Sequence, residues 1–178
     1  MNKTNSIDKT RQWLENMVIG LHLCPFAKKP YQTDKIRYIV LESNDLEQLT
    51  LLLINELQFL QKTPANEVET TLLILENVLA DFQEFWDYTG LMENMLADLK
   101  YEGIFQLASF HPQYQFAGTA ADAAENYTNR SPYPIIHILR EASITKALEN
   151  YPNPETIPVR NIALLEGMNP ADLASKIK

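Results

Sequence analysis

Apolar segments typical of β-strands alternate with amphipathic segments typical of helices, and this alternation constrains the fold of the chain most. The strand-like segments are rich in β-branched and aromatic residues and cover 36–42, 70–76 and 103–110. The first intervening helix ends before Pro64, and the second runs from Asp81 to about Lys100. Strands that alternate with helices form right-handed crossovers between parallel strands. The sequence therefore predicts an α/β fold with a parallel βαβαβ core whose three strands lie side by side.

A fourth strand is expected at 135–140, directly after Pro134, because proline is tolerated where a strand begins. A loop of roughly twenty residues without a clear helical pattern leads to it, whereas parallel strands are usually joined through a helix. We therefore expect this strand to be added antiparallel at the side of the sheet. The predicted fold class is α/β, with a mixed four-stranded sheet and flanking helices.

Local signals predict where the helices begin and end. Ser6 is expected to cap the first helix, and Asn44 with Glu47 has the spacing of a capping box. Gly90 weakens the helical pattern around it, so a break is expected there. The polar segment 28–34 is interpreted as a loop. Further helices are expected in the tail, at 143–150, in a segment ending near Glu166, and after Asn169-Pro170.

Size and composition indicate one globular domain over residues 1–178, with the first few residues frayed. Hydrophobic residues make up 46% of the chain and charged residues 21%, which is typical of globular proteins. A single cysteine, Cys24, excludes an internal disulfide framework and a cysteine-rich zinc site. No run of about 18 apolar residues and no leader pattern is present, so a soluble cytoplasmic protein without a membrane partner is expected.

The net charge of −8 is unevenly distributed. Residues 1–41 contain seven basic and three acidic side chains, whereas residues 42–102 contain two basic and thirteen acidic ones. This acidic middle would repel a phosphate backbone, which argues against nucleic acid as a partner. The acidic excess is interpreted as an aid to solubility, and the alternative is a helical face that binds a basic protein.

The connection from Phe110 to Glu141 is the strongest functional signal, because ordinary connections are short and this one is long and rich in polar and aromatic side chains. His111 directly follows the third strand, and open α/β sheets bind ligands outside the carboxyl ends of their parallel strands. An antiparallel fourth strand would begin at the same edge. We therefore expect a site for a small anionic molecule at this edge.

Each candidate residue has a proposed role in that site. Arg130 is the best anchor for an anion, because a guanidinium presents a fixed fork to carboxylate or phosphate. Cys24 is a candidate nucleophile and His111 a candidate general acid or base. Other substrate-binding candidates in the same loop are Asn126, Tyr114 and Tyr133.

Structural alternatives remain open for the same residues. Cys24 is more often a small buried hydrophobe in such a context. The alternative for His111 is a structural histidine that caps its strand. His137 is interpreted as a hydrogen-bonded core histidine. Asn126, with Asn129, would hold turns, while the tyrosines would pack. Arg130 would form an internal salt bridge, to Glu125 or Glu141.

A metal site is permitted but not favoured. Cys24, His111, His137 and Glu141 could supply ligands in principle, but their spacing is long and irregular. No cofactor is indicated either. Three classes of function therefore stay open: an enzyme acting on a small anion, a ligand- or metal-binding module without turnover, and an interaction protein. The oligomeric state cannot be read from the pattern.

Three motifs resemble one bacterial family, the domain of unknown function 1415. They are G-L-H-L-C-P-F-A at 20–27, S-F-H-P-Q-Y-Q-F-A-G at 109–118, and N-Y-T-N-R-S-P-Y-P at 126–134, followed by H-I-L-R-E. The resemblance covers nearly the whole chain and implies a small bacterial cytoplasmic protein. His22 occupies a variable position of the first motif. The resemblance implies no activity.

Overall fold

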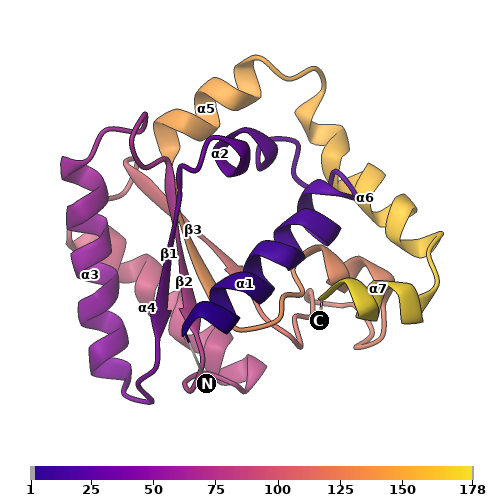
Figure 1. Cartoon of the computed structure of the whole chain (residues 1–178), viewed down its shortest axis with the longest axis horizontal. Coiled ribbons are helices and arrows are strands. Elements are labelled where there is room, and N and C mark those ends of the chain that lie inside the picture. Colours follow the sequence, from indigo (N-terminus) through magenta and orange to yellow (C-terminus); the bar gives the residue numbers. More distant parts are fainter. Residues whose placement is uncertain (1–2, 178) are drawn as a thin grey trace.

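The computed structural model describes residues 3–177 and contains a four-stranded mixed sheet between helical layers (Figure 1). The strands are β1 (Ile36–Leu41), β2 (Thr70–Leu75), β3 (Phe105–Phe110) and β4 (Ile135–Arg140). β1 pairs with β2 in parallel, and β4 pairs antiparallel with both β2 and β3. The predicted mixed α/β class and the antiparallel direction of β4 are therefore confirmed. The expected fraying of the first residues concerns 1 and 2, which lie outside the described range.

The predicted position of β4 is wrong. The strand order is β1-β2-β4-β3, so β4 lies between β2 and β3, and the three helix-linked strands do not lie side by side. The physical reason is burial on both faces, because Ile135, Ile136 and Ile138 are at most 1% exposed. Since β2 and β3 both run antiparallel to β4, the loops that follow them still leave at the same edge of the sheet.

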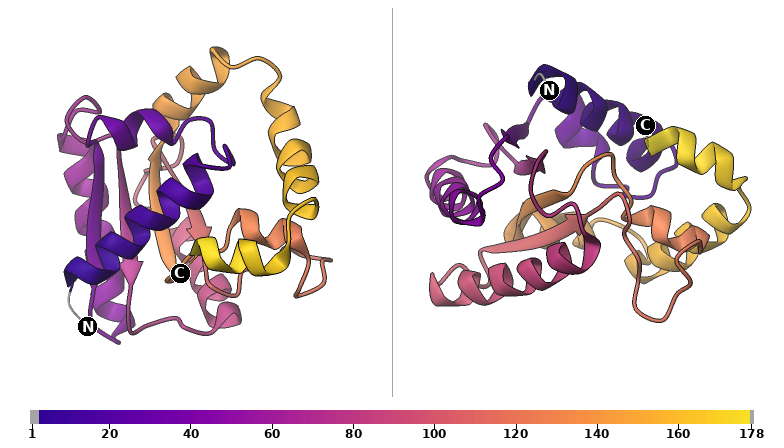
Figure 2. Two further views of the ribbon diagram at one scale, coloured as in Figure 1. Left: turned by 45° about the vertical axis from the view of Figure 1, so that its right-hand side comes forward. Right: turned by 90° about the horizontal axis from the view of Figure 1, so that it is seen from below.

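Helices α3 (Leu46–Lys62) and α4 (Phe82–Asp98) cover one face of the sheet. The opposite face is covered by α1 (Lys3–Trp13), its π-helical continuation η1 (Leu14–Ile19) and α7 (Pro170–Ile177). Figure 2 shows the sheet between these two layers. The remaining elements are α2 (Lys28–Gln32), the 3-10 helices η2 (Ala124–Thr128) and η3 (Pro154–Thr156), α5 (Glu141–Glu149) and α6 (Ile157–Glu166).

Two predicted helix starts are wrong by a few residues. Asp45, not Asn44, caps α3, because its carboxylate accepts a hydrogen bond from the Glu47 N–H at 2.8 Å. Ser6 lies inside α1, where its buried hydroxyl donates to Glu76. The Asp81 cap of α4 is confirmed, since its carboxylate accepts from two backbone N–H groups at 2.8 and 3.0 Å.

The break predicted at Gly90 and part of the loop predicted at 28–34 are both helical in the structure. α4 continues through Gly90 without a break, because the helix is held by buried residues around it, including Thr89 and Met92. The glycine itself faces open space, so its lack of a side chain costs no packing contact. Residues 28–32 form the short helix α2 instead of a loop, with Pro30 in its first turn, where proline is tolerated.

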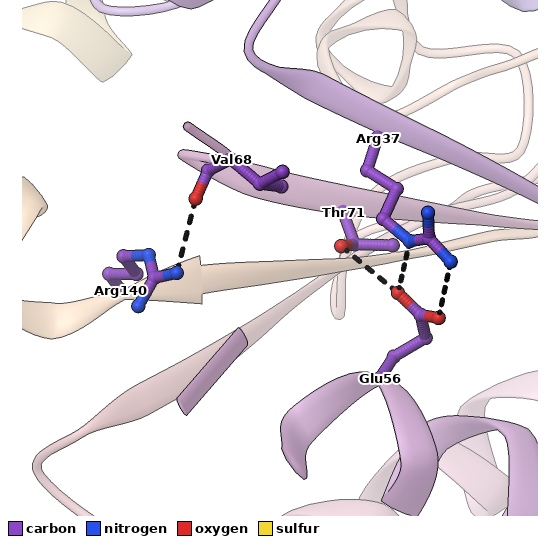
Figure 3. Close-up of polar contacts among 5 residues, drawn as sticks. All are labelled: Arg37, Glu56, Val68, Thr71 and Arg140. Carbon is purple, nitrogen blue, oxygen red and sulfur yellow. Dashed lines mark hydrogen bonds and ion pairs between the residues drawn. The ribbon is translucent and has the colours of Figure 1, made fainter. Parts of the chain in front are cut away.

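Two arginines tie the sheet to α3 and to the loop that follows it, and Figure 3 shows their contacts with Glu56 and Val68. Arg37 of β1 donates from Nε and Nη2 to the Glu56 carboxylate at 2.9 and 3.2 Å. Arg140, at the end of β4, donates from Nη2 to three backbone carbonyls at the end of α3 and in the loop after it, those of Leu60, Thr63 and Val68. A cation placed there also opposes the negative end of the helix dipole. Arg140 is therefore a structural residue.

Candidate functional site

The loop between β3 and β4 is organised around Asn126, which is fully buried. Its side-chain oxygen accepts hydrogen bonds from the Phe116 N–H and the Thr119 hydroxyl, both at 2.9 Å. Its amide nitrogen donates to the Ala120 carbonyl at 2.8 Å. Both ends of this amide are thus engaged within the loop. These contacts favour the alternative that Asn126 holds turns over a role in substrate binding, which stays a prediction.

His111 joins the loop to α4 and is 0% exposed. Its Nδ1 accepts from the Gln113 N–H at 3.0 Å, so Nε2 carries the proton and donates to the Leu79 carbonyl at 3.2 Å. The ring packs against Phe82 and Phe85, with centroids 5.4 and 5.1 Å away. Burial lowers the pKa of His111 and keeps it neutral. Both nitrogens are occupied, so the contacts favour a structural histidine over a general acid or base.

The two candidate tyrosines are packing residues in their described contacts. Tyr114 is 5% exposed, and its ring lies 5.2 Å from that of Phe82 and 5.0 Å from that of Phe116. Burial raises the pKa of the Tyr114 hydroxyl. Tyr133 packs with Ile135 in the core beneath α1, and its carbonyl accepts from the buried Ser131 hydroxyl. Their predicted role in substrate binding is not tested by these contacts.

Arg130 is held rigidly in the same loop. Its Nε donates to the Tyr114 carbonyl at 3.3 Å, and Nη2 donates to the Ala121 carbonyl. The guanidinium carbon lies 4.6 Å from the centre of the Tyr127 ring, within cation–π distance. The side chain is thus oriented before any ligand arrives, which reduces the entropy lost on binding.

The charge of Arg130 is not neutralised within the described part of the chain. Neither of the alternative ion pairs, to Glu125 or Glu141, forms, and no other described carboxylate pairs with this guanidinium. An arginine has five N–H groups. The two hydrogen bonds to carbonyls use two of them, which leaves three, including both of Nη1, for a ligand or water.

A pocket of about 380 Å³ opens beside this arginine. It is lined by Phe82, Pro112, Gln113, Gln115, Ala121 and Arg130. Its volume falls within the range of small-molecule sites, and its lining combines one cation, amide side chains and an aromatic wall. Sequence reasoning missed Phe82, Gln113 and Gln115. The available signal was that Phe82 opens the helix after β2, at the same edge of the sheet where His111 follows β3.

Cys24 lies in the turn that follows η1, and it packs against the same core as Ala124 and Tyr127 of the loop between β3 and β4. It packs at the border of the core formed by α1, η1 and α7. Burial raises the pKa of the Cys24 thiol, and backbone hydrogen bonds from Phe26 and Ala27 only partly offset this. No described contact joins Cys24 to His111 or Arg130. Its role as a nucleophile, and its convergence with those residues, stay predictions.

Two residues of α6 hold this cysteine turn and were not found from the sequence. Asn161, only 3% exposed, donates from Nδ2 to the Leu23 carbonyl at 2.8 Å. Arg160 donates from Nη2 to the carbonyl of His22, which has a positive φ of 54°. The two segments are 138 residues apart in the chain, so no local pattern could have indicated the contact.

His137 is confirmed as a hydrogen-bonded histidine of the sheet. The Thr70 hydroxyl donates to the Ile138 carbonyl, and it therefore accepts the Nε2–H of His137 at 2.6 Å. Burial lowers the pKa of His137 to about 4. Within residues 3–177, no group of three or more His, Cys, Asp or Glu side chains is placed to hold a metal ion. The metal-binding alternative has no support there.

The chain belongs to the family described as protein of unknown function (DUF1415), whose family model matches residues 5–175. The resemblance carried by the three motifs is therefore confirmed. No curated protein and no solved structure matches the chain. Among the described helices, none has the length and apolar character needed to cross a membrane.

Proposed function

We propose that this protein binds a small organic anion in the pocket beside Arg130, in the bacterial cytoplasm. The observation that carries the proposal is the guanidinium itself. It lines a pocket, its orientation is set by two carbonyls and an aromatic ring, and no carboxylate of the described residues neutralises it. Two of its five N–H groups hold the loop, and the remaining three are available to an anion.

The contacts support binding more than turnover. Nucleophilic catalysis needs a nucleophile within hydrogen-bond reach of a base. Neither Cys24, with a raised pKa, nor His111, with both nitrogens engaged, has such a contact among the described residues. Gln113 adds an amide group to the pocket, and amide N–H groups suit recognition of a carboxylate, whereas the Gln115 amide nitrogen already donates to the Thr119 carbonyl at 2.6 Å.

Substitution of Arg130→Lys tests the proposal, with acetate and inorganic phosphate as probes in titrations followed by NMR. The ammonium keeps the charge but cannot make the paired contact. We expect affinity to fall by about 1.5–3 kcal/mol, the value of a charged hydrogen bond.

Arg11→Lys is the matched control. Arg11 also stacks on a tyrosine, at 4.5 Å from the Tyr38 ring, but it already pairs with Asp34 at 3.5 Å. The control should bind both probes as the wild type does. Equal affinity of Arg130→Lys and wild type for both probes, with a lower melting temperature, would contradict the proposal and leave Arg130 as a loop-holding residue.

A further inference from the structure

The anion pocket continues into an aromatic wall that is open to solvent. Phe82 lines the pocket, and its ring lies 6.2 Å from the ring of Trp86. The two residues are four positions apart on α4, so they lie on the same face of the helix. Trp86 is 49% exposed, although its ring is large and apolar. The wall therefore extends from the pocket onto the surface.

This wall is fixed in place before a ligand binds. Tyr114 contacts both rings, Phe82 at 5.2 Å and Trp86 at 6.3 Å, the second in an edge-to-face arrangement. Tyr114 is itself packed against Phe116, with ring centroids 5.0 Å apart. Aromatic rings prefer offset or edge-to-face partners at these distances. A ligand ring would therefore bind to side chains that are already ordered, so the protein itself would lose little conformational entropy.

The residues that line the pocket favour a ligand with a single negative charge. Arg130 is the one cation among the residues that line the pocket. One guanidinium can balance one carboxylate, whereas further negative charges on a ligand would have no cationic partner among the lining residues.

We propose that the ligand is an aryl monocarboxylate, an inference that rests on the anion site proposed above. The carboxylate lies on Arg130, and the ring lies against Phe82 and Trp86. A pocket of about 380 Å³ admits a single-ring acid of this kind. The aromatic wall supplies the apolar contact area, and the guanidinium supplies the orientation.

NMR titrations with four probes test this inference: phenylacetate, acetate, phenylacetamide and citrate. The chain has two tryptophans, and Trp13 is 1% exposed while Trp86 is half exposed, so their indole N–H signals report separately on core and wall. Phenylacetate should bind about tenfold more tightly than acetate, the gain from one aromatic pair. It should shift the Trp86 signal and leave that of Trp13 in place. Phenylacetamide, which has no charge, and citrate should both bind more weakly than phenylacetate.

Two variants of α4 sharpen the test. Trp86→Leu should reduce phenylacetate to nearly the affinity of acetate. Leu91→Ala, at a residue of the same helix that is 64% exposed, should leave the ratio of the two unchanged. Equal affinities of phenylacetate and acetate, both weakened by Arg130→Lys, would overturn the aromatic inference and leave the anion site standing. Tighter binding of phenylacetamide or of citrate than of phenylacetate would also overturn it, and failure of every anion to bind would remove both proposals.

Discussion

The ion pair between Arg37 and Glu56 should be strongly asymmetric in its response to mutation. Glu56 is only 5% exposed, in the middle of α3, and its carboxylate depends on two hydrogen bonds from Arg37. The remaining acceptor contact, from the Thr71 hydroxyl, is long at 3.4 Å. Arg37→Met therefore leaves a buried carboxylate almost without partners, while the new side chain can still cover the Phe59 ring that Arg37 now contacts at 4.4 Å.

The cost can be estimated from burial. Removing one partner of a buried ion pair costs about 3–5 kcal/mol. Because the Arg37 side chain is 38% exposed, water can partly reach the abandoned carboxylate, so we expect the lower end, about 3 kcal/mol. For a chain of this length that corresponds to a fall in melting temperature of about 6–12 °C. Glu56→Met should cost less, about 1 kcal/mol, because water can solvate the half-exposed guanidinium left behind.

The double variant decides whether this reasoning is correct. Arg37→Met with Glu56→Met removes both charges, and replacing a buried pair by apolar side chains is often nearly neutral. We expect the free energy of unfolding of the double variant to be within about 2 kcal/mol of wild type and higher than that of Arg37→Met alone. The remaining loss comes from the Thr71 hydroxyl, which no longer has the Glu56 carboxylate as an acceptor. Urea unfolding of the four proteins gives the coupling energy. A double variant as unstable as the sum of the singles would refute the account.

Three further results are expected. His137 has a pKa lowered to about 4 in the folded protein, against a usual value of 6.5, so its contribution to stability is complete above about pH 6.5 and falls as the pH drops towards 4. In urea unfolding measured across this pH range, His137→Gln should make the free energy of unfolding less dependent on pH. An unchanged pH dependence in the variant would contradict this account. Cys24 should react with iodoacetamide only as the pH rises above the ordinary thiol value of 9.0, because burial raises its pKa; rapid alkylation below pH 8 would instead indicate an activated thiolate and revive the catalytic role. Asn126→Ala leaves the Phe116 N–H and the Ala120 carbonyl without their partner, so it should cost about 2–4 kcal/mol and increase hydrogen exchange in 112–130, which thermal melts and exchange measurements check.

The strands and most helices could be predicted from the sequence because their signals are local. The run 135–140 has the composition of a strand wherever it pairs, and Asp81 caps α4 through its own neighbours. The order of the strands in the sheet is not determined by local signals, because it depends on which faces the whole chain can bury. The continuous apolar run in β4 already suited an interior strand, but only assembly of both helical layers decided that it lies between β2 and β3.

For the candidate site too, some features could be predicted from the sequence and others could not. The long polar loop and its arginine were visible in the sequence, because loop length and residue type do not depend on context. Only the tertiary structure decided that the Asn126 amide is hydrogen-bonded within the loop, that Cys24 packs against the core beneath α1, and that Phe82 lines the same pocket as Arg130. Hydrogen bonds between Asn161 and Leu23 or rings stacked between α4 and the loop join residues far apart in the chain, and such contacts exist only once packing has excluded water and brought them together.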